Sequence, residues 1–327
     1  MATRTLLVTV SVDPDERATI DAALPRTVTA TFLDDLAADR QPTAVENAEA
    51  LLSRVPHREL SAGAFDRIHD GQIIQLGSAG IDHIPVDRFP DGVTVLSNAG
   101  VYAEPMAEHA LALYLALSKR LLIEHRKLEA GEFDQFHPNR WVAGSTCAIF
   151  GFGAAGQAAA GLLKPLGVRV LGINRRGEAD EEVDFVGTPD DLDAVLESCD
   201  GLLITAALTP ETEGAIDREK LRLMDDDGML INVARGEIVD QRDLYEHLQA
   251  NPEFQAGIES WWTEPVRHGE FALEYPLLDL PNVLGCPHNA SQVPGIHEHA
   301  LRTAAENVAA ALTDGSPDNV VNEDRGY

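Results

Sequence analysis

Lysine is scarce in this chain. It stands only at positions 119, 127, 164 and 220, and the 25 basic residues face 54 acidic ones, which leaves a net charge of −29. Such a field repels nucleic acid and anionic lipid, so neither is an expected partner. Lysine depletion along the whole chain is typical of surfaces adapted to molar salt, where ions screen the repulsion between carboxylates. We therefore expect a halophilic protein, similar to cytosolic proteins of halophilic archaea; an ordinary solvated acidic surface is the alternative.

Cysteine is also rare. Cys147, Cys199 and Cys286 are odd in number, are scattered along the chain and lack the spacing of metal ligands. This pattern predicts reduced thiols and no metal site, which suits a cytoplasmic protein. A nucleophilic cysteine or a zinc site is the alternative.

Long apolar runs are missing as well. The longest apolar helical run, residues 110–117, ends at Ser118-Lys119-Arg120, well short of the roughly 20 residues that span a bilayer. The apolar run at 6–10 is too short for a signal peptide and leads into acidic residues. We expect a cytoplasmic protein with no membrane partner.

Short apolar runs alternate with amphipathic stretches, which predicts parallel sheets with helices on both faces. The expected strands of a first series are 6–10, 28–32, 50–54, 73–76 and 93–96, followed by one long helix over 104–128. Those of a second series are 147–150, 168–173, 184–186, 202–205, 229–233, 257–260 and 283–286. The predicted fold class is α/β: two doubly wound parallel-sheet domains with a cleft between them. A last helix, 296–312, could belong to either.

A glycine-rich turn follows the first strand of the second series. Gly151, Gly153 and Gly156 form a Gly-x-Gly-x-x-Gly pattern with Ala154 and Ala155 between them, and a helix follows. Glycine permits a tight turn, close approach of backbone to a pyrophosphate and close packing of helix on strand. The free N–H groups at the helix N-terminus attract phosphate. This turn predicts a dinucleotide site.

Three polar residues follow strand ends in the second series. Arg235, Glu264 and His288 each come shortly after an apolar strand, where open α/β sheets bind ligands. An arginine can grip a carboxylate with two hydrogen bonds, and a histidine beside a carboxylate can transfer a proton. Taken singly, each could be a surface ion pair, a turn residue or a loop histidine. Together, downstream of a dinucleotide turn, they predict an active site for a 2-oxo acid.

At this point the sequence resembles the D-isomer-specific 2-hydroxyacid dehydrogenase family over nearly its whole length. The motifs that carry the resemblance are residues 75–82, Asn98-Ala99-Gly100, residues 107–110, the glycine turn, residues 208–212, residues 232–236, residues 259–265 and Pro287-His288. The resemblance implies a flavodoxin-like substrate domain, residues 1–100 with 295–327, and a Rossmann dinucleotide-binding domain, residues 101–294. It also implies a homodimer that forms through the dinucleotide-binding domain.

The resemblance also implies roles for single residues. Arg235 would bind the substrate carboxylate and polarise the carbonyl, His288 would exchange the proton of the C2 oxygen, and Glu264 would orient His288 and keep it protonated. The backbone of Ser78, Ala79 and Gly80 would hold the carboxylate. Besides the glycine turn, the implied cofactor contacts are Asn174, Arg175, Arg176, Thr205, Ala206, Thr212, Val233, Ala234, Glu259 and Ser291.

Some positions depart from the family pattern. Glu259 stands where the family usually has aspartate near the nicotinamide carboxamide, Ala207 replaces a common proline, and Ala290 a common glycine. The retained Glu264 argues against a formate dehydrogenase, in which glutamine partners the histidine. A dehydrogenase for another donor such as phosphite, or a dinucleotide-sensing protein of the co-repressor type, keeps the same fold and is the alternative.

The turn after the second strand of this domain bears on the cofactor. An NAD enzyme typically has Asp or Glu there to bind the ribose 2′-OH, whereas this chain has Asn174 followed by Arg175 and Arg176. Two arginines in so acidic a chain favour a 2′-phosphate, so we expect NADP(H) to be preferred over NAD(H). Pairing with Glu178 or Glu181, or stacking on adenine, is the alternative.

The charge pattern makes stability depend on salt. We expect the melting temperature to rise from low salt into molar KCl, because salt screens repulsion between the acidic side chains. Thermal melting followed by circular dichroism at several KCl concentrations measures this. A midpoint that stays flat or falls contradicts the halophilic interpretation.

Overall fold

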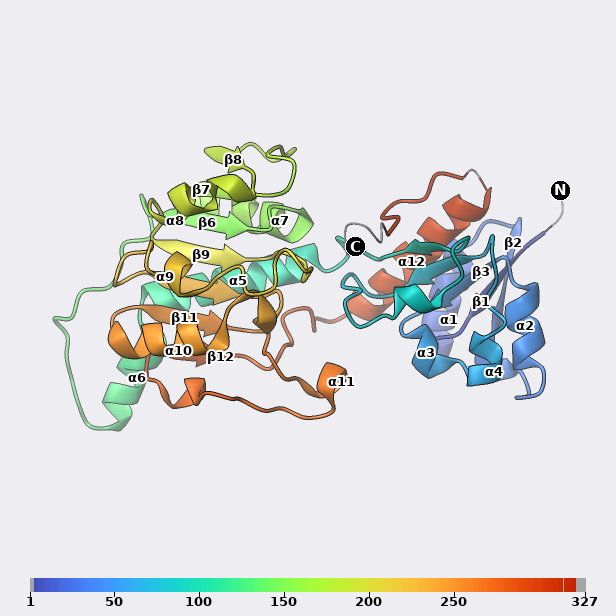
Figure 1. Ribbon diagram of the computed structural model, residues 1–327, viewed down its shortest axis with the longest axis horizontal. Helices are drawn as coiled ribbons and strands as arrows, with labels where there is room; N and C mark the ends of the chain where they lie inside the picture. Colours follow the sequence, from blue (N-terminus) through green and yellow to red (C-terminus); the bar gives the residue numbers. More distant parts are fainter. Residues whose placement is uncertain (1–2, 314, 322–327) are drawn as a thin grey trace. The chain divides into compact units, whose positions relative to one another are not determined.

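The structure is a computed structural model, and it describes residues 3–313 and 315–321. The chain divides into two compact units, one formed by Met1–Tyr102 with Val293–Tyr327 and the other by Ala103–Gln292 (Figure 1). Each unit is built around a single parallel sheet. The predicted fold class, two doubly wound α/β domains, is confirmed.

The first unit holds a five-stranded sheet in the order β2-β1-β3-β4-β5. Its strands are β1 (Arg4–Val8), β2 (Val28–Phe32), β3 (Ala50–Ser53), β4 (Ile73–Leu76) and β5 (Thr94–Leu96). All four pairings are parallel. This order is that of flavodoxin-like folds, in which ligands bind beyond the carboxyl ends of the strands.

Helices cover both faces of this sheet. They are α1 (Pro14–Ala23), α2 (Gln41–Asn47), α3 (Pro56–Glu59), α4 (Ala62–Phe65) and α12 (Ile296–Thr313), with short 3-10 turns η1 (Leu33–Asp35) and η2 (Val86–Arg88). The last helix packs against α1, β3 and β4. Its Leu301, Ala305 and Val308 recur at helical spacing and share a core with Leu6 and Leu52. The helix that periodicity left unassigned, and that the family resemblance placed with residues 1–100, therefore packs on the first unit.

The second unit holds a seven-stranded sheet in the order β12-β11-β10-β9-β6-β7-β8, parallel throughout. Its strands are β6 (Thr146–Phe150), β7 (Arg169–Ile173), β8 (Phe185–Gly187), β9 (Gly201–Ile204), β10 (Met229–Asn232), β11 (Gln255–Ile258) and β12 (Val283–Gly285). The direction of winding reverses between β6 and β9. Dinucleotides bind at such a switch point in Rossmann folds.

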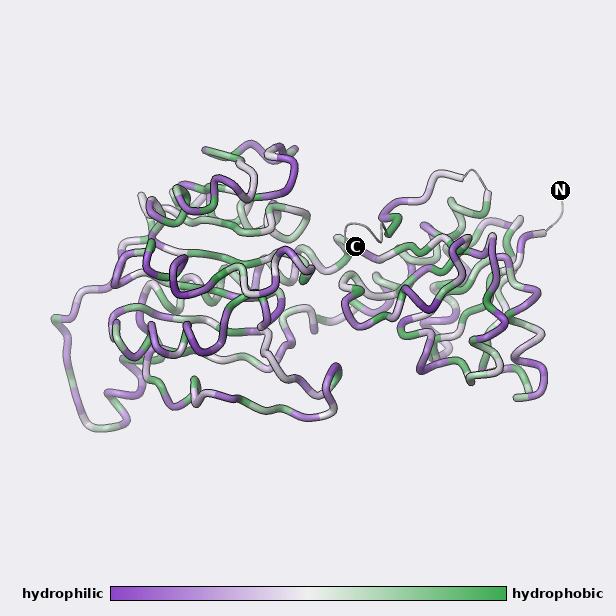
Figure 2. The backbone as a smooth tube through the Cα atoms, in the orientation of Figure 1, coloured by the Kyte–Doolittle hydropathy of each residue, from purple (hydrophilic) through white to green (hydrophobic). Residues whose placement is uncertain are grey.

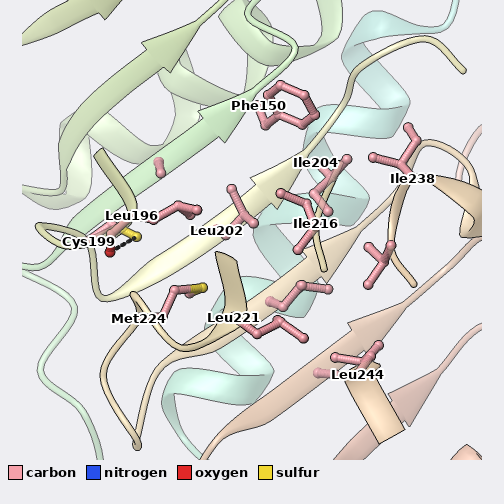
Figure 3. Packing of buried hydrophobic residues seen from close by; sticks show 14 of the residues in the cluster. Phe150, Leu196, Cys199, Leu202, Ile204, Ile216, Leu221, Met224, Ile238 and Leu244 are labelled. Carbon is pink, nitrogen blue, oxygen red and sulfur yellow. Dashed lines mark hydrogen bonds between the residues drawn. The ribbon is translucent and has the colours of Figure 1, made fainter. Parts of the chain in front are cut away.

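Alternate residues of these strands face two separate cores. Cys147 and Ile149 of β6 lie in a core with α5 (Ala103–Ser118) and α7 (Ala154–Leu163). Ala148 and Phe150 lie in the other, with α8 (Leu192–Leu196), α9 (Arg218–Leu221) and α10 (Gln241–Ala250), part of which Figure 3 shows. In Figure 2 hydrophobic colour follows the central strands, as expected of a sheet that is covered on both faces. The remaining short elements are α11 (Pro265–His268), η3 (Lys164–Leu166), η4 (Pro189–Asp191), η5 (Gly236–Ile238) and η6 (Leu277–Asp279).

The prediction of one helix over 104–128 is wrong. The structure has two helices, α5 and α6 (Leu121–Glu129), separated by Arg120, which adopts the left-handed conformation with φ 52°. A left-handed residue ends the helical hydrogen-bond ladder. The Arg120 side chain is only 9% exposed and pairs with Glu253 at 2.6 Å, a contact distant in sequence. Helical periodicity continues across the break, so the sequence alone does not reveal it.

The cysteines are free thiols. Burial raises the pKa of Cys147 and raises that of Cys199 to about 12, so neither is poised as a thiolate nucleophile. Among the described residues no cluster of His, Cys, Asp or Glu could hold a metal ion. No helix in the described part of the chain has the length and apolar character that a membrane span requires.

Candidate active site

The predicted site residues of the second unit lie at one edge of its sheet. Because β10, β11 and β12 are adjacent and parallel, their carboxyl ends are side by side. Arg235 follows β10, Glu264 follows β11 and His288 follows β12. The glycine turn follows β6 at the same edge.

The glycine turn has the geometry that a pyrophosphate needs. Gly151 has φ 100°, and a Cβ there would lie 2.2 Å from the backbone nitrogen of Ala206. A Cβ on Gly156 would lie 2.9 Å from the carbonyl oxygen of Gly151. A Cβ on Gly153 would meet nothing within 4 Å, and no side chain caps α7, which begins at Ala154. The first and third glycines are thus required by packing, while the second leaves open space before uncapped N–H groups, which fits a dinucleotide phosphate.

The threonines of the implied cofactor set hold loops in place. Thr205 donates its hydroxyl hydrogen to the carbonyl oxygen of Gly151 at 2.8 Å, which ties the end of β9 to the glycine turn. Thr212 donates to the carbonyl oxygen of Ala207 at 2.7 Å and accepts from the N–H of Thr209 at 2.8 Å. These contacts hold the loop that follows β9, so both threonines have a structural role in addition to any contact with a cofactor.

His288 and Glu264 form a close pair. The Nδ1 atom of His288 lies 2.8 Å from both carboxylate oxygens of Glu264. The His288 side chain is 38% exposed and that of Glu264 only 7%. His288 has φ 52°, a left-handed conformation that is costly for a side-chain-bearing residue and persists where function requires it. The pair therefore fixes the Nδ1 edge of the imidazole and leaves the ring partly exposed.

Glu264 stays ionised although it is buried. Burial alone would raise the pKa of its carboxyl group, but hydrogen bonds from His288 and from the N–H of Trp261, with the charges of His288 and Arg235, hold this pKa below its ordinary value. The Trp261 bond is 2.7 Å long. A negative charge therefore lies beside Nδ1 of His288.

Arg235 lies on a turn that is held by hydrogen bonds of Asn232, beside the pair of His288 and Glu264. Asn232 donates its side-chain amide to the carbonyl oxygen of Arg235 at 2.7 Å and accepts from the N–H of Ala234 at 3.0 Å. Val233 and Ala234 are buried within the turn. The half-buried Arg235 is close enough to lower the pKa of Glu264. The structure thus brings together the three residues that the sequence singled out in this unit.

Glu259 has a contact that sequence reasoning missed. Its side chain is fully buried, and its Oε1 accepts the N–H of Ala290 at 2.8 Å. Its carbonyl oxygen accepts the N–H of His288 at 3.1 Å. Glu259 therefore holds the backbone on both sides of the His288 turn, just ahead of Ser291. The sequence indication of this contact was that glutamate replaces the family's usual aspartate at position 259. The side chain of aspartate is one methylene shorter and reaches less far toward the N–H of Ala290.

An ion pair and backbone contacts join the loop that carries Arg235 to the loop that carries Glu264. Glu237 pairs with Arg267 at 2.7 Å, with side chains 20% and 16% exposed, and the Trp262 indole donates to the carbonyl oxygen of Val239 at 2.7 Å. A Cβ on Gly236 would lie 2.5 Å from the backbone between residues 261 and 262. No sequence motif indicated these contacts, because the residues that they join share no sequence pattern.

The predicted cofactor-selecting turn follows β7. The Asn174 side chain shapes this turn: its Oδ1 accepts the N–H groups of Arg176 and Gly177, both at 2.9 Å, and its amide donates to the carbonyl oxygen of Glu178 at 2.8 Å. Arg175 and Arg176 are exposed. Glu181, one alternative partner for them, pairs with Lys164 at 2.8 Å.

Ser78, Ala79 and Gly80 lie in the first unit, directly after β4. All three are half-buried, and the carbonyl oxygen of Ser78 accepts the N–H of Asn98 at 2.9 Å. The buried hydroxyl of Ser78 has no hydrogen-bond partner within the described ranges. This loop thus offers a polar group that the protein itself leaves unsatisfied, at the ligand-binding edge of the first sheet.

Comparison with known proteins agrees with this geometry. Residues 111–290 match the family model "D-isomer specific 2-hydroxyacid dehydrogenase, NAD binding domain". The chain is 31% identical over 288 residues to a glyoxylate reductase of Korarchaeum cryptofilum, covering 86% of this chain and 84% of that one. It is 34% identical over 255 residues to glyoxylate/hydroxypyruvate reductase B of Pectobacterium carotovorum, covering 75% and 77%.

A solved structure is similar over the full length. It is the D-isomer specific 2-hydroxyacid dehydrogenase of Xanthobacter autotrophicus in complex with NADPH and MES, which has a TM-score of 0.80 and 25% identity and covers 100% of both chains. The fold, the glycine turn, the family model and these relatives agree. The chain belongs to the D-isomer specific 2-hydroxyacid dehydrogenase family.

Proposed function

We propose that this protein reduces a small 2-oxo acid to the D-2-hydroxy acid, with NADPH as the preferred reductant. The observation that carries the proposal is the contact of His288 Nδ1 with both oxygens of a buried, ionised Glu264, beside Arg235 and at the same sheet edge as the glycine turn. The names of the relatives, glyoxylate and hydroxypyruvate reductases, favour a small substrate.

Each residue has a distinct role in the proposed reaction. Arg235 binds the substrate carboxylate and polarises the C2 carbonyl. In the first unit, the backbone N–H groups of Ser78, Ala79 and Gly80 donate to a substrate carboxylate. Glu264 holds His288 through Nδ1, so that Nε2 gives its proton to the C2 oxygen. The bound nicotinamide supplies the hydride for C2. Hydride and proton together convert the carbonyl to an alcohol, and oxidation is the reverse.

The remaining assignments complete the proposal. Residues 1–100 with 295–327 form the substrate domain, and residues 101–294 form the dinucleotide-binding domain. We propose a homodimer through the latter. Phe133, Phe136 and Trp141 support this, because their side chains are 78%, 84% and 81% exposed in one short segment of that unit.

NADP(H) preference rests on the turn after β7. Arg175 and Arg176 are exposed, and Asn174 fixes the backbone between them. No carboxylate stands at the position that would repel a 2′-phosphate. The Xanthobacter autotrophicus relative is a complex with NADPH, which supports the same cofactor here.

Substitution of the substrate-binding and proton-transferring residues tests the reaction. We expect Arg235→Gln to lower kcat/KM for glyoxylate or hydroxypyruvate by ~10³-fold or more, since a charged clamp and carbonyl polariser is worth ~4 kcal/mol. We expect His288→Ala to cost ~10²- to 10⁴-fold. Arg222→Gln and His125→Ala, which alter exposed residues of the same unit, serve as controls. Near-normal reduction by either site variant contradicts the proposal, and dinucleotide binding without turnover by the wild type indicates a sensing protein.

The role of Glu264 has a pH signature. Because the pKa of Glu264 lies below its ordinary value, its negative charge is present at neutral and alkaline pH, beside Nδ1 of His288. In Glu264→Gln this charge is gone, and a neighbouring carboxylate is what favours the charged form of a base. The alkaline limb of the reduction rate should then move about one unit toward lower pH. Rate profiles of wild type, Glu264→Gln and the exposed control Glu274→Gln measure this; an unmoved limb shows that Glu264 does not govern the proton of His288.

Cofactor choice is tested at Arg175 and Arg176. A charge-assisted contact to phosphate is worth ~1.5–3 kcal/mol, so Arg175→Ala or Arg176→Ala should reduce the ratio of kcat/KM for NADPH over NADH by ~10- to 100-fold. Arg169→Ala is the matched control, because it removes an exposed arginine at the opposite end of the same strand. If the wild type uses NADH as well as or better than NADPH, the interpretation of this turn is wrong.

A further inference from the structure

Glu264 is bonded to two histidines, of which only His288 has a role in the proposed reaction. The other is His268, four positions after Glu264, whose Nδ1 atom accepts the backbone N–H of Glu264 at 3.0 Å. The backbone N–H of His268 in turn donates to the carbonyl oxygen of Glu264 at 2.7 Å. Both backbone polar groups of Glu264 are therefore bonded to one residue. His268 lies beyond the motif at 259–265, so the sequence did not single it out.

The two imidazoles bind Glu264 in opposite senses. A backbone N–H can only donate, so Nδ1 of His268 carries the lone pair and the hydrogen of that ring is on Nε2. An ionised carboxylate can only accept, so Nδ1 of His288 carries a hydrogen. His268 is therefore an acceptor for the backbone of Glu264, and His288 is a donor to its side chain.

The N–H of Glu264 needs this acceptor. Glu264 is only 5% exposed, and a buried N–H without a partner costs about as much as a lost hydrogen bond. Within residues 3–313 and 315–321 no other acceptor for this N–H is found. Trp261 and His288 hold the carboxylate, at the far end of the side chain. His268 thus fixes the backbone from which that side chain leaves.

His268 is itself held in a defined place. It is the last residue of the one-turn helix α11 (Figure 1), and Gly269 then turns the chain with φ 86° and donates its N–H to the first carbonyl oxygen of the helix at 2.9 Å. Arg267, the neighbouring residue of α11, pairs with Glu237 in the loop after β10. The imidazole is exposed, so its removal creates no buried cavity. A substitution at this position therefore tests the contact with Glu264.

We propose that His268 is a positioning residue of the active site: it fixes the backbone of Glu264 and thereby the carboxylate that holds His288. The inference rests on the proposed function, since it concerns proton transfer at the same site. His268 acts through Glu264 and contacts neither substrate nor nicotinamide. Because small displacements of reacting groups are costly in rate, loss of this contact should slow turnover and leave cofactor binding unchanged.

Two substitutions of His268 test the inference. His268→Ala removes the acceptor, whereas His268→Asn keeps one, because the amide oxygen of asparagine is bonded to Cγ as Nδ1 of histidine is. We expect His268→Ala to lower kcat for glyoxylate by ~5- to 50-fold and to change KM for NADPH by less than about twofold. We expect His268→Asn to recover kcat to within about threefold of the wild type. Rates are compared at neutral and alkaline pH, because an imidazole with hydrogens on both nitrogens has no acceptor.

The pH profile separates positioning from a general loss of structure. A neighbouring carboxylate favours the charged form of a base, and the effect weakens with distance. The alkaline limb of the reduction rate should therefore move toward lower pH in His268→Ala, by less than the shift of about one unit expected for Glu264→Gln. It should return to the wild-type position in His268→Asn.

His125→Ala is the matched control. It removes an exposed histidine of the same unit, which pairs with Glu129 at 3.6 Å, and its kcat and alkaline limb should match those of the wild type. The inference is overturned if His268→Ala keeps the wild-type kcat and alkaline limb, or if His268→Asn is as slow as His268→Ala.

Nitrogen-15 NMR of the histidine side chains tests the contact in the wild type and needs no variant to fold. The inference requires the neutral ring of His268 to carry its hydrogen on Nε2, and a hydrogen on Nδ1 overturns it. If the wild type reduces 2-oxo acids and His268→Ala is unaffected, the inference fails while the proposed function stands. If the wild type reduces no 2-oxo acid, both fail.

Discussion

The parallel direction of all seven strands in the second unit is the constraint on which its site depends. In a parallel sheet every carboxyl end lies at the same edge, so loops that are distant in sequence become neighbours. The glycine turn after β6 and the loops after β10, β11 and β12 meet there. His288 reaches Glu264 across 24 positions of sequence because β11 and β12 pair in register. Glu259, at the end of β11, then fixes the His288 turn through the N–H of Ala290.

Charge is distributed unevenly at this edge. In a chain of net charge −29, positive groups stand where the proposed function places negatively charged ligands: Arg235 beside the His288 pair, and Arg175 and Arg176 after β7. The acidic residues within these sites act on protein groups. Glu264 binds His288, and Glu259 holds the backbone of the His288 turn. The overall field would repel anionic substrates, so local cations at strand ends are the physical requirement for binding them.

Two kinds of contact make the site rigid. Hydrogen bonds from asparagine side chains hold the backbone of each loop, as Asn232 does for Arg235 and Asn174 does for the turn after β7. Contacts between loops then fix one loop relative to another, as Glu237 and Arg267 do. Residues of the first kind stand in local motifs. Those of the second kind are recognised only in three dimensions.

The sequence by itself predicted the fold class, each strand that the described residues form, and the three residues Arg235, Glu264 and His288 that the second unit brings to one sheet edge. It could do so because buried strands, glycine turns and strand-end polar residues are local patterns with a physical cause. Halophilic character, cytoplasmic location and NADP(H) preference stay predictions from the same source. The tertiary structure alone decided that a helix breaks at Arg120, that Glu259 anchors the His288 turn and that Glu237 pairs with Arg267. Each of these depends on which distant residues come within a few ångströms, and one chain's local pattern does not encode that distance.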